Sequence, residues 1–316
     1  MRRTAVLAPS RRAFRNPLMR RLFDQRYLLL LSLPFVIWLI VFKYIPLTGW
    51  AMAFQDYKPQ NGFFNQDFAG LKHFKALFAA RQFYQALQNT LGMSFLGLVF
   101  GFTTSIGFAI LLNELRTLHF KRFTQTISYL PHFVSWVIVA NIVTNILSPS
   151  GPVNELLVKW GIVERPYNFM IQQDLFWWIV VFSDVWKETG WNAIIYLAAI
   201  TGIDAAIYEA AEIDGVNRLQ KIWYITLPGI KSTITILLIM SIGNIINIGF
   251  EKQMLLGNSV VSAKSLVLDK YALDYGIGLF RYSFGTAIGI FKSVVSIILL
   301  IIANTAARKV GEDRLI

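Results

Sequence analysis

The segment YEAAEIDGVNRLQKIWYITLPGI, residues Tyr208–Ile230, is short, polar and charged, although long apolar segments lie on both sides of it. Asp204, just before it, has a side chain that can cap a helix over residues 205–213. Asp214 and Gly215 predict the end of this helix, because glycine readily adopts the left-handed conformation found at many helix ends. The segment therefore begins with a short, capped helix.

A second short helix is predicted directly after that turn. Asn217 and Gln220 have the three-residue spacing of a capping box. Pro228 is expected to stop the helix, because proline has no N–H to donate and its ring clashes with the preceding turn. A simple connection between two membrane spans needs neither caps nor a glycine turn, so we interpret residues 204–230 as a docking element.

The composition indicates a membrane protein. The 316 residues are 55% hydrophobic and 15% charged, with a mean hydropathy of +0.51, whereas soluble domains are about a quarter charged. Cysteine is absent, which excludes disulfides, thiolate metal sites and cysteine nucleophiles. His73, His119 and His132 lack metal-ligand spacing, and we predict no metal site.

Six apolar segments approach the roughly 20 residues that a helix needs to cross a bilayer. Their polarity does not alternate as it does in the strands of membrane barrels, so we predict an all-α integral membrane protein. A basic tail, residues 1–26, precedes the transmembrane domain, residues 27–316. The predicted spans are residues 27–50, 89–112, 124–147, 175–200, 232–250 and 284–305.

Charge predicts the orientation. The tail holds eight of the 30 lysines and arginines. Residues 27–50 are too long for the core of a signal peptide and lack a small-residue cleavage site, so we expect an uncleaved first span. With the N-terminus inside, the inner segments hold 17 lysines and arginines and the outer ones ten. The positive-inside rule then places both termini and residues 204–230 in the cytoplasm, and the net charge of +12 does not require a nucleic-acid partner.

The docking element resembles the EAA loop in the membrane subunits of binding-protein-dependent ABC importers. Its spacing is Glu-Ala-Ala, three residues, Gly, nine residues, then Ile-x-Leu-Pro. The form EAAEIDG is similar to the sugar-importer branch, although Val216 stands where alanine is common. The matching residues are Glu209, Ala210, Ala211, Gly215, Ile225, Leu227 and Pro228.

Two other segments resemble a subgroup of sugar permeases for complex oligosaccharides. They are FKYIPLTGWAMAFQDYKPQNGFF (Phe42–Phe64), which is followed by FAGLKHFKALF, and DVWKETGWNAIIYLAAITGID (Asp184–Asp204). The resemblance extends from Tyr27 to Ala306, and the tail matches in basic character alone. It implies the type I ABC importer permease fold, with six transmembrane helices and the coupling loop between the fourth and fifth spans.

The resemblance also implies a mechanism and partners. The coupling helix sits in a cleft of an ATP-binding subunit. Closure of two such subunits, which bind ATP and Mg²⁺, moves two permease subunits between inward-facing and outward-facing states, and an extracytoplasmic binding protein delivers the solute. The chain has no G-x-x-x-x-G-K-[ST] phosphate loop. We therefore expect a transport subunit of a bacterial inner membrane, without a cofactor of its own, that depends on an ATPase in another chain.

Within the coupling loop, the resemblance places Glu209 against the ATP-binding subunit; the alternative is a solvated carboxylate paired within its own loop. Ala210 and Ala211 permit close approach of a partner, although alanine also simply favours helix. The coupling element is completed by Asp214, Gly215, Leu227 and Pro228.

The fourth predicted span is unusually polar. Asp184, Lys187 and Glu188 share one helical face. They either line the translocation path or form an ion cluster at the outer interface. Trp186 and Trp191 suit either stacking on a sugar or an interfacial aromatic belt.

Other candidates for the substrate path lie in spans four to six. Asn244 and Asn247 suggest a broken, cavity-lining helix or interhelical hydrogen bonds. Lys292 is either a lumen charge for an anionic substrate or the partner of an acid. Glycine pairs at 97 and 101 and at 285 and 289 predict close helix packing. The candidate path residues are Asn244, Asn247, Trp186, Trp191, Asn192 and Lys292.

The preferred function is ATP-driven import of a saccharide, on the resemblance an oligosaccharide. Lys292 and the basic balance hint at an acidic sugar, such as an alginate or pectin fragment. One alternative is an ABC importer for a non-sugar solute, and another is an ion-coupled secondary transporter, in which the coupling loop would have no purpose. A membrane enzyme is disfavoured, because we find no G-x-S-x-G motif, no metal spacing and no clustered acid pair in a plausible cleft.

Overall fold

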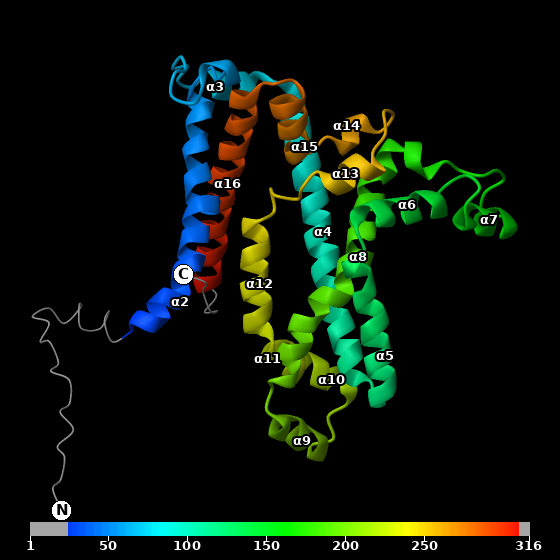
Figure 1. The fold of residues 1–316 in the computed structure, drawn as a ribbon. Helices are drawn as coiled ribbons and strands as arrows, with labels where there is room; N and C mark the ends of the chain where they lie inside the picture. Colours follow the sequence, from blue (N-terminus) through cyan, green and yellow to red (C-terminus); the bar gives the residue numbers. More distant parts are fainter. Residues whose placement is uncertain (1–24, 310–316) are drawn as a thin grey trace, which may run out of the picture. The chain divides into compact units, whose positions relative to one another are not determined.

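The computed structural model describes residues 25–309, and no β-strand forms within that range (Figure 1). The chain divides into two compact units, Met1–Ala51 and Met52–Ile316. The first contains α2 (Arg26–Leu39), the π-helical turn that follows it (Ile40–Tyr44) and the first part of a 3₁₀ helix (Ile45–Phe54). Its apolar side chains are exposed, as expected of a helix in lipid. The predicted tail, residues 1–26, lies almost wholly outside the described residues.

The second unit contains the remaining helices, which vary widely in length. They are α3 (Lys72–Ala79), α4 (Arg81–Glu114), α5 (Leu118–Tyr129), α6 (Trp136–Ile146), α7 (Pro152–Lys159), α8 (Gln173–Thr201), α9 (Ala205–Ile213), α10 (Arg218–Lys221), α11 (Leu227–Gly229), α12 (Lys231–Gly243), α13 (Glu251–Leu256), α14 (Ser262–Ser265), α15 (Leu268–Ala272) and α16 (Tyr282–Lys309).

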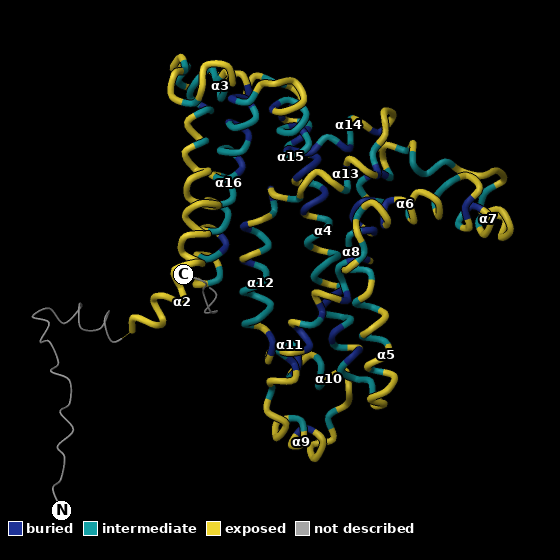
Figure 2. Tube along the Cα trace, viewed as in Figure 1, coloured by how far each residue is buried: buried dark blue, intermediate teal, exposed yellow. Residues whose placement is uncertain are grey.

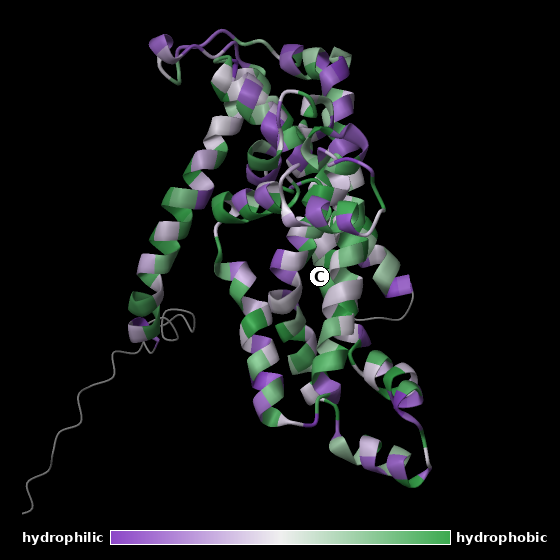
Figure 3. Cartoon of the chain, turned by 90° about the vertical axis from the view of Figure 1, so that its right-hand side faces the viewer, coloured by the Kyte–Doolittle hydropathy of each residue, from purple (hydrophilic) through white to green (hydrophobic). Residues whose placement is uncertain are grey.

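Length and composition identify candidate spans among the described residues. Arg26–Phe54, α4 and α16 are each long and apolar enough to cross a membrane. Three helix pairs pass the same test together but are bent, so up to six spans result. Ile297 and Ile301 on α16 are more than half exposed. Figure 2 shows buried residues, in dark blue, on α4, α8 and α16, and Figure 3 shows hydrophobic residues, in green, along the long helices.

Two predicted spans differ from straight helices. Residues 124–147 are broken: helix ends at Phe133, α6 begins at Trp136, and the two parts are bent by 103°. The break follows Pro131, which cannot donate a backbone hydrogen bond, and the Ser135 side chain caps α6. Residues 232–250 are helical only to Gly243, the end of α12.

Close contacts fix α5, α8 and α16. A Cβ added to Gly190 on α8 would lie 2.0 Å from the carbonyl oxygen of Ser128 on α5, so only glycine permits this approach. Gly285 on α16 similarly contacts Gly276. Gly97, Gly101 and Gly289 make no such contact with the described residues, since a Cβ at each would meet nothing within 4 Å.

Candidate functional site

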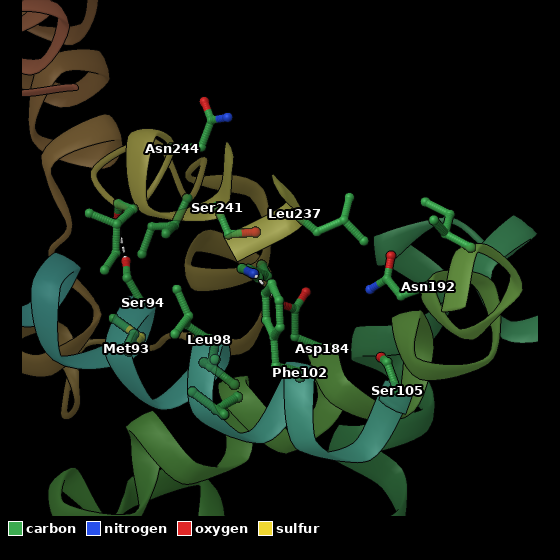
Figure 4. A pocket seen from close by; sticks show the side chains of 18 of the residues that line it. Met93, Ser94, Leu98, Phe102, Ser105, Asp184, Asn192, Leu237, Ser241 and Asn244 are labelled. Atoms are coloured by element: carbon green, nitrogen blue, oxygen red, sulfur yellow. Dashed lines mark hydrogen bonds and ion pairs between the residues drawn. The ribbon is translucent and has the colours of Figure 1, made fainter. Parts of the chain in front are cut away.

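A cavity of about 330 Å³ opens between α4, α8, α12 and α13 (Figure 4). Its volume falls at the lower end of the roughly 300–1,000 Å³ of small-molecule sites. One wall, on α4, contains the open glycines Gly97 and Gly101. The polar and aromatic lining residues are Ser94, Phe102, Ser105, Asp184, Asn192, Tyr196, Ser241, Asn244, Lys252 and Gln253.

A single ion pair supplies the charge of this cavity. The Lys252 ammonium on α13 lies 2.9 Å from the Asp184 carboxylate on α8, and 5.7 Å from the centroid of the Trp136 ring on α6. No other lining residue in the described part of the chain is charged. Both side chains are only partly exposed, so their charges are less screened than those of a surface pair.

Two buried polar groups of the cavity have no hydrogen-bond partner within the described residues. Gln253 is 0% exposed, and neither atom of its amide is paired. The Ser105 hydroxyl on α4 is likewise buried and unpaired. These amide and hydroxyl atoms are closed to solvent, so they lie behind the cavity surface and a solute in the cavity does not reach them.

The predicted path residues separate into two groups. Asn192 and Asn244 line the cavity; Figure 4 places Asn192 beside it and shows the Asn244 amide turned away from Asp184. Asn247 instead donates to the Ser296 hydroxyl at 2.8 Å. Lys292 pairs with Asp269 outside the cavity, so the cation on which the acidic-sugar hint depended is already the partner of an acid.

The polar residues of α8 also divide. Lys187 donates to the His132 carbonyl at 2.6 Å and to the Glu188 carboxylate at 3.0 Å. The other oxygen of the Glu188 carboxylate forms a hydrogen bond of 2.7 Å with Nδ1 of the His132 ring. Trp191 stacks on the same ring at 4.3 Å. These contacts tie the break between α5 and α6 to α8, and separate Lys187 and Glu188 from Asp184.

Several residues at or near this cavity differ from what the sequence predicts. Trp186 is half-exposed and does not line the cavity. Lys252 and Gln253 were missed because residues 251–283 read as an outer loop. Gly97 and Gly101 were noticed, but their spacing was interpreted as packing rather than as open space.

The docking element has the local structure that its sequence predicts. The Asp204 side chain accepts from Ala206 N–H at 2.9 Å and caps α9. Asn217 and Gln220 form the capping box of α10. Gly215 has φ +72°, a conformation that side-chain-bearing residues rarely adopt. Helix α9 follows α8 directly at a bend of 70°.

Two contacts hold the helices of the docking element together. Lys221 and Glu212 form an ion pair at 2.6 Å, and the hydroxyls of Tyr208 and Thr226 are 2.9 Å apart. The hydrogen bond and positive charge of Lys221 lower the pKa of the Glu212 carboxyl. Glu209 is exposed and makes no ion pair with any described residue, so the carboxylate paired within the loop is Glu212.

Pro228 does not end the second helix, contrary to the sequence prediction. A π-helical turn (Ile222–Thr226) precedes α11, and helix continues through Pro228 to Gly229. Because a π-helical turn is wider than an α-helical turn, it needs no hydrogen bond from the nitrogen of Pro228 and leaves room for the proline ring. The 59° bend falls one residue later, before α12, where a Cβ on Gly229 would lie 2.6 Å from the Ile203 side chain.

Comparison with known proteins agrees with this architecture. Residues 97–312 match the family described as "Binding-protein-dependent transport system inner membrane component". The polygalacturonan/rhamnogalacturonan transport system permease protein YteP of Bacillus subtilis (strain 168) is 42% identical over 300 residues, covering 95% of this chain and 93% of that protein.

Solved structures give the same result. A chain in the crystal structure of a bacterial ABC transporter involved in the import of the acidic polysaccharide alginate matches with a TM-score of 0.85 and 38% identity, covering 94% of this chain and 100% of that chain. A chain of the bacterial alginate ABC transporter in complex with an alginate pentasaccharide-bound periplasmic protein matches with a TM-score of 0.86, 38% identity and coverage of 95% and 100%. The resemblance and the type I fold are thereby confirmed. The chain belongs to the family of inner-membrane components of binding-protein-dependent transport systems, as a multi-pass ABC permease subunit rather than an enzyme.

Proposed function

We propose that this chain forms part of the translocation path of an ATP-driven importer for oligosaccharides, and that the cavity between α4, α8, α12 and α13 holds a sugar unit during transport. The observation that carries this proposal is the lining of the cavity, in which the Asn192 and Asn244 amides and the Ser241 hydroxyl accompany a single ion pair. Sugar hydroxyls both donate and accept hydrogen bonds, so they satisfy an amide and a hydroxyl together.

The lining chemistry suits a saccharide better than an apolar solute. Phe102 and Tyr196 place two aromatic rings, 6.3 Å apart, beside the polar groups. Serines and asparagines supply further hydrogen-bonding partners with no fixed charge. The similar proteins named above are a polygalacturonan/rhamnogalacturonan transport system permease and a chain of a transporter that imports the acidic polysaccharide alginate, which supports an oligosaccharide here.

The proposal includes the partners that this chain needs. A second permease subunit completes the path, two ATP-binding subunits bind ATP and Mg²⁺, and an extracytoplasmic binding protein delivers the sugar. Helix α9 is the contact with one ATP-binding subunit through the exposed Glu209 and Ala210, whereas Ala211 is buried within this chain. Support comes from the exposure of the Glu209 carboxylate and from the capped, glycine-terminated helix that presents it.

Vesicle uptake tests the proposed function. Vesicles with the assembled importer, its binding protein and ATP should accumulate a radiolabelled oligosaccharide, and vesicles without ATP should not. Uptake without ATP by vesicles holding this chain alone would instead support a secondary transporter. Uptake of a non-sugar solute, with no oligosaccharide binding at all, would also refute the proposal.

A further inference from the structure

We propose that Lys252 is the residue by which the cavity selects a carboxylate-bearing sugar unit, and that Asp184 holds its ammonium in place and limits how tightly the sugar binds. This inference rests on the proposed function, because it assigns a substrate class, uronate-containing oligosaccharides, to the same cavity. It differs from the expectation based on Lys292, which lies outside the cavity and is paired with Asp269.

The first step concerns the hydrogen bonds of Lys252. An ammonium group has three N–H donors and no acceptor. Asp184 accepts at 2.9 Å, and the Trp136 ring lies 5.7 Å away. The geometry therefore leaves donor capacity for an anion in the cavity that Lys252 lines.

The second step is electrostatic. Because Lys252 and Asp184 neutralise each other, the lining has no net charge, and a neutral sugar leaves this pair undisturbed. A uronate brings its own negative charge and gains a charge-assisted hydrogen bond from Lys252, the strongest type available here. Discrimination between the two sugars thus depends on the ammonium.

The third step concerns the role of Asp184 in limiting how tightly the sugar binds. A transport site must bind well enough to admit its substrate and weakly enough to release it. The Asp184 carboxylate repels a nearby uronate and competes for the same ammonium. Asp184 therefore keeps the affinity moderate while it fixes the position of Lys252 on α13 against α8.

The chain offers a matched control for Lys252. Lys264 on α14 also lies over a tryptophan, 5.0 Å from the centroid of the Trp177 ring. It does not line the cavity. Changes at Lys264 therefore reproduce the loss of a lysine–tryptophan contact without affecting the cavity.

The experiment measures equilibrium binding to the purified, assembled importer without its binding protein. The probes are the trisaccharide of galacturonic acid and its methyl ester, which has nearly the same shape but no charge. Lys252→Gln should weaken binding of the acid about tenfold and leave the ester unchanged. Lys252→Arg should restore the preference for the acid, and Lys264→Gln should change neither affinity.

Asp184→Asn should tighten binding of the acid and slow its ATP-driven uptake, with no change for the ester. Weaker acid binding in this variant would contradict the role given to Asp184. An equal loss of both probes in Lys252→Gln, or an unchanged preference for the acid, would overturn the inference while leaving an oligosaccharide importer. A wild-type importer that binds neither probe would instead refute the proposed function of the cavity.

Discussion

Glycine forms part of the cavity wall on α4, and the space beside it is open. Gly97 and Gly101 line the cavity, and a Cβ at either would meet nothing within 4 Å. The helix therefore tolerates a leucine at Gly101, but the leucine side chain fills part of the cavity in which we propose that the solute binds. We expect Gly101→Leu to reduce uptake about tenfold or more, since even one methylene group alters a fitted site by roughly 1–3 kcal/mol.

Gly107 provides the comparison for this substitution. It lies on the same helix, a Cβ there also meets nothing within 4 Å, and it does not line the cavity. Gly107→Leu should assemble and transport like the parent. Equal transport by both leucine variants would show that the solute passes elsewhere.

Glu209 is the residue whose loss should separate ATP hydrolysis from transport. It is exposed on α9, outside the lipid-facing helices, so Glu209→Ala should leave the fold intact. Removing one partner of a charged contact at an interface costs several kcal/mol, about 2–5, when the contact is buried. Uptake should fall sharply, and the loaded binding protein should no longer stimulate ATP hydrolysis, when both are measured on the same vesicles.

Two further variants of the coupling loop test this assignment. Glu212→Gln removes only the exposed pair with Lys221 and should have little effect. Gly215→Val should be at least as harmful as Glu209→Ala, because φ +72° is strained for a β-branched residue. Parental transport by both Glu209→Ala and Gly215→Val would exclude α9 as the coupling helix.

At the scale of elements, the contact of α5 with α8 depends on Gly190. Alanine there would place a Cβ 2.0 Å from a backbone oxygen, so the helices must separate. Gly190→Ala should destabilise the chain by about 1–3 kcal/mol, the usual cost of overpacking. Gly289→Ala gains the same helix propensity in open space and should be neutral or slightly stabilising, as thermal unfolding of the detergent-solubilised protein would show.

The sequence predicts some elements well, for physical reasons that are local. Caps and a left-handed glycine are set by neighbouring residues, so α9 and α10 were predictable from Asp204, Gly215 and Asn217. The bend after Pro131 and the helix through Pro228 were not, because a proline either breaks a helix or is accommodated by a π-helical turn, and the sequence does not tell which occurs. Lys252 was missed because it reaches the cavity through the position of α13 in the fold, which the residues around Lys252 do not reveal.

At the scale of the whole molecule, the chain supplies a path but no motor. The purified chain should not hydrolyse ATP, since no phosphate loop is present. Hydrolysis should require a second permease and two ATP-binding subunits, and a loaded binding protein should stimulate it. Robust hydrolysis by this chain in the absence of other subunits would contradict that division of labour.

Orientation can be tested directly because cysteine is absent. Ser10→Cys introduces a unique thiol in the basic tail. The positive-inside rule predicts a cytoplasmic tail, so an impermeant maleimide should label this thiol in inverted vesicles and not in intact cells. Labelling of this thiol in intact cells would contradict the predicted cytoplasmic location of the tail.

Helix α8 joins the coupling loop to the cavity without interruption. It contains no proline, and about 25 Å of helix separates Thr201 from Asp184 at 1.5 Å per residue. If α9 docks on an ATP-binding subunit as proposed, we expect its displacement to pass through the 70° bend into α8 and along this helix. Helix α12, on the other side of the coupling loop, ends at Gly243 and gives way to a non-helical segment. Helices on both sides of the coupling loop thus reach the cavity, α8 at Asp184 and α12 at Leu237 and Ser241, so we expect a displacement of this loop to move both walls together.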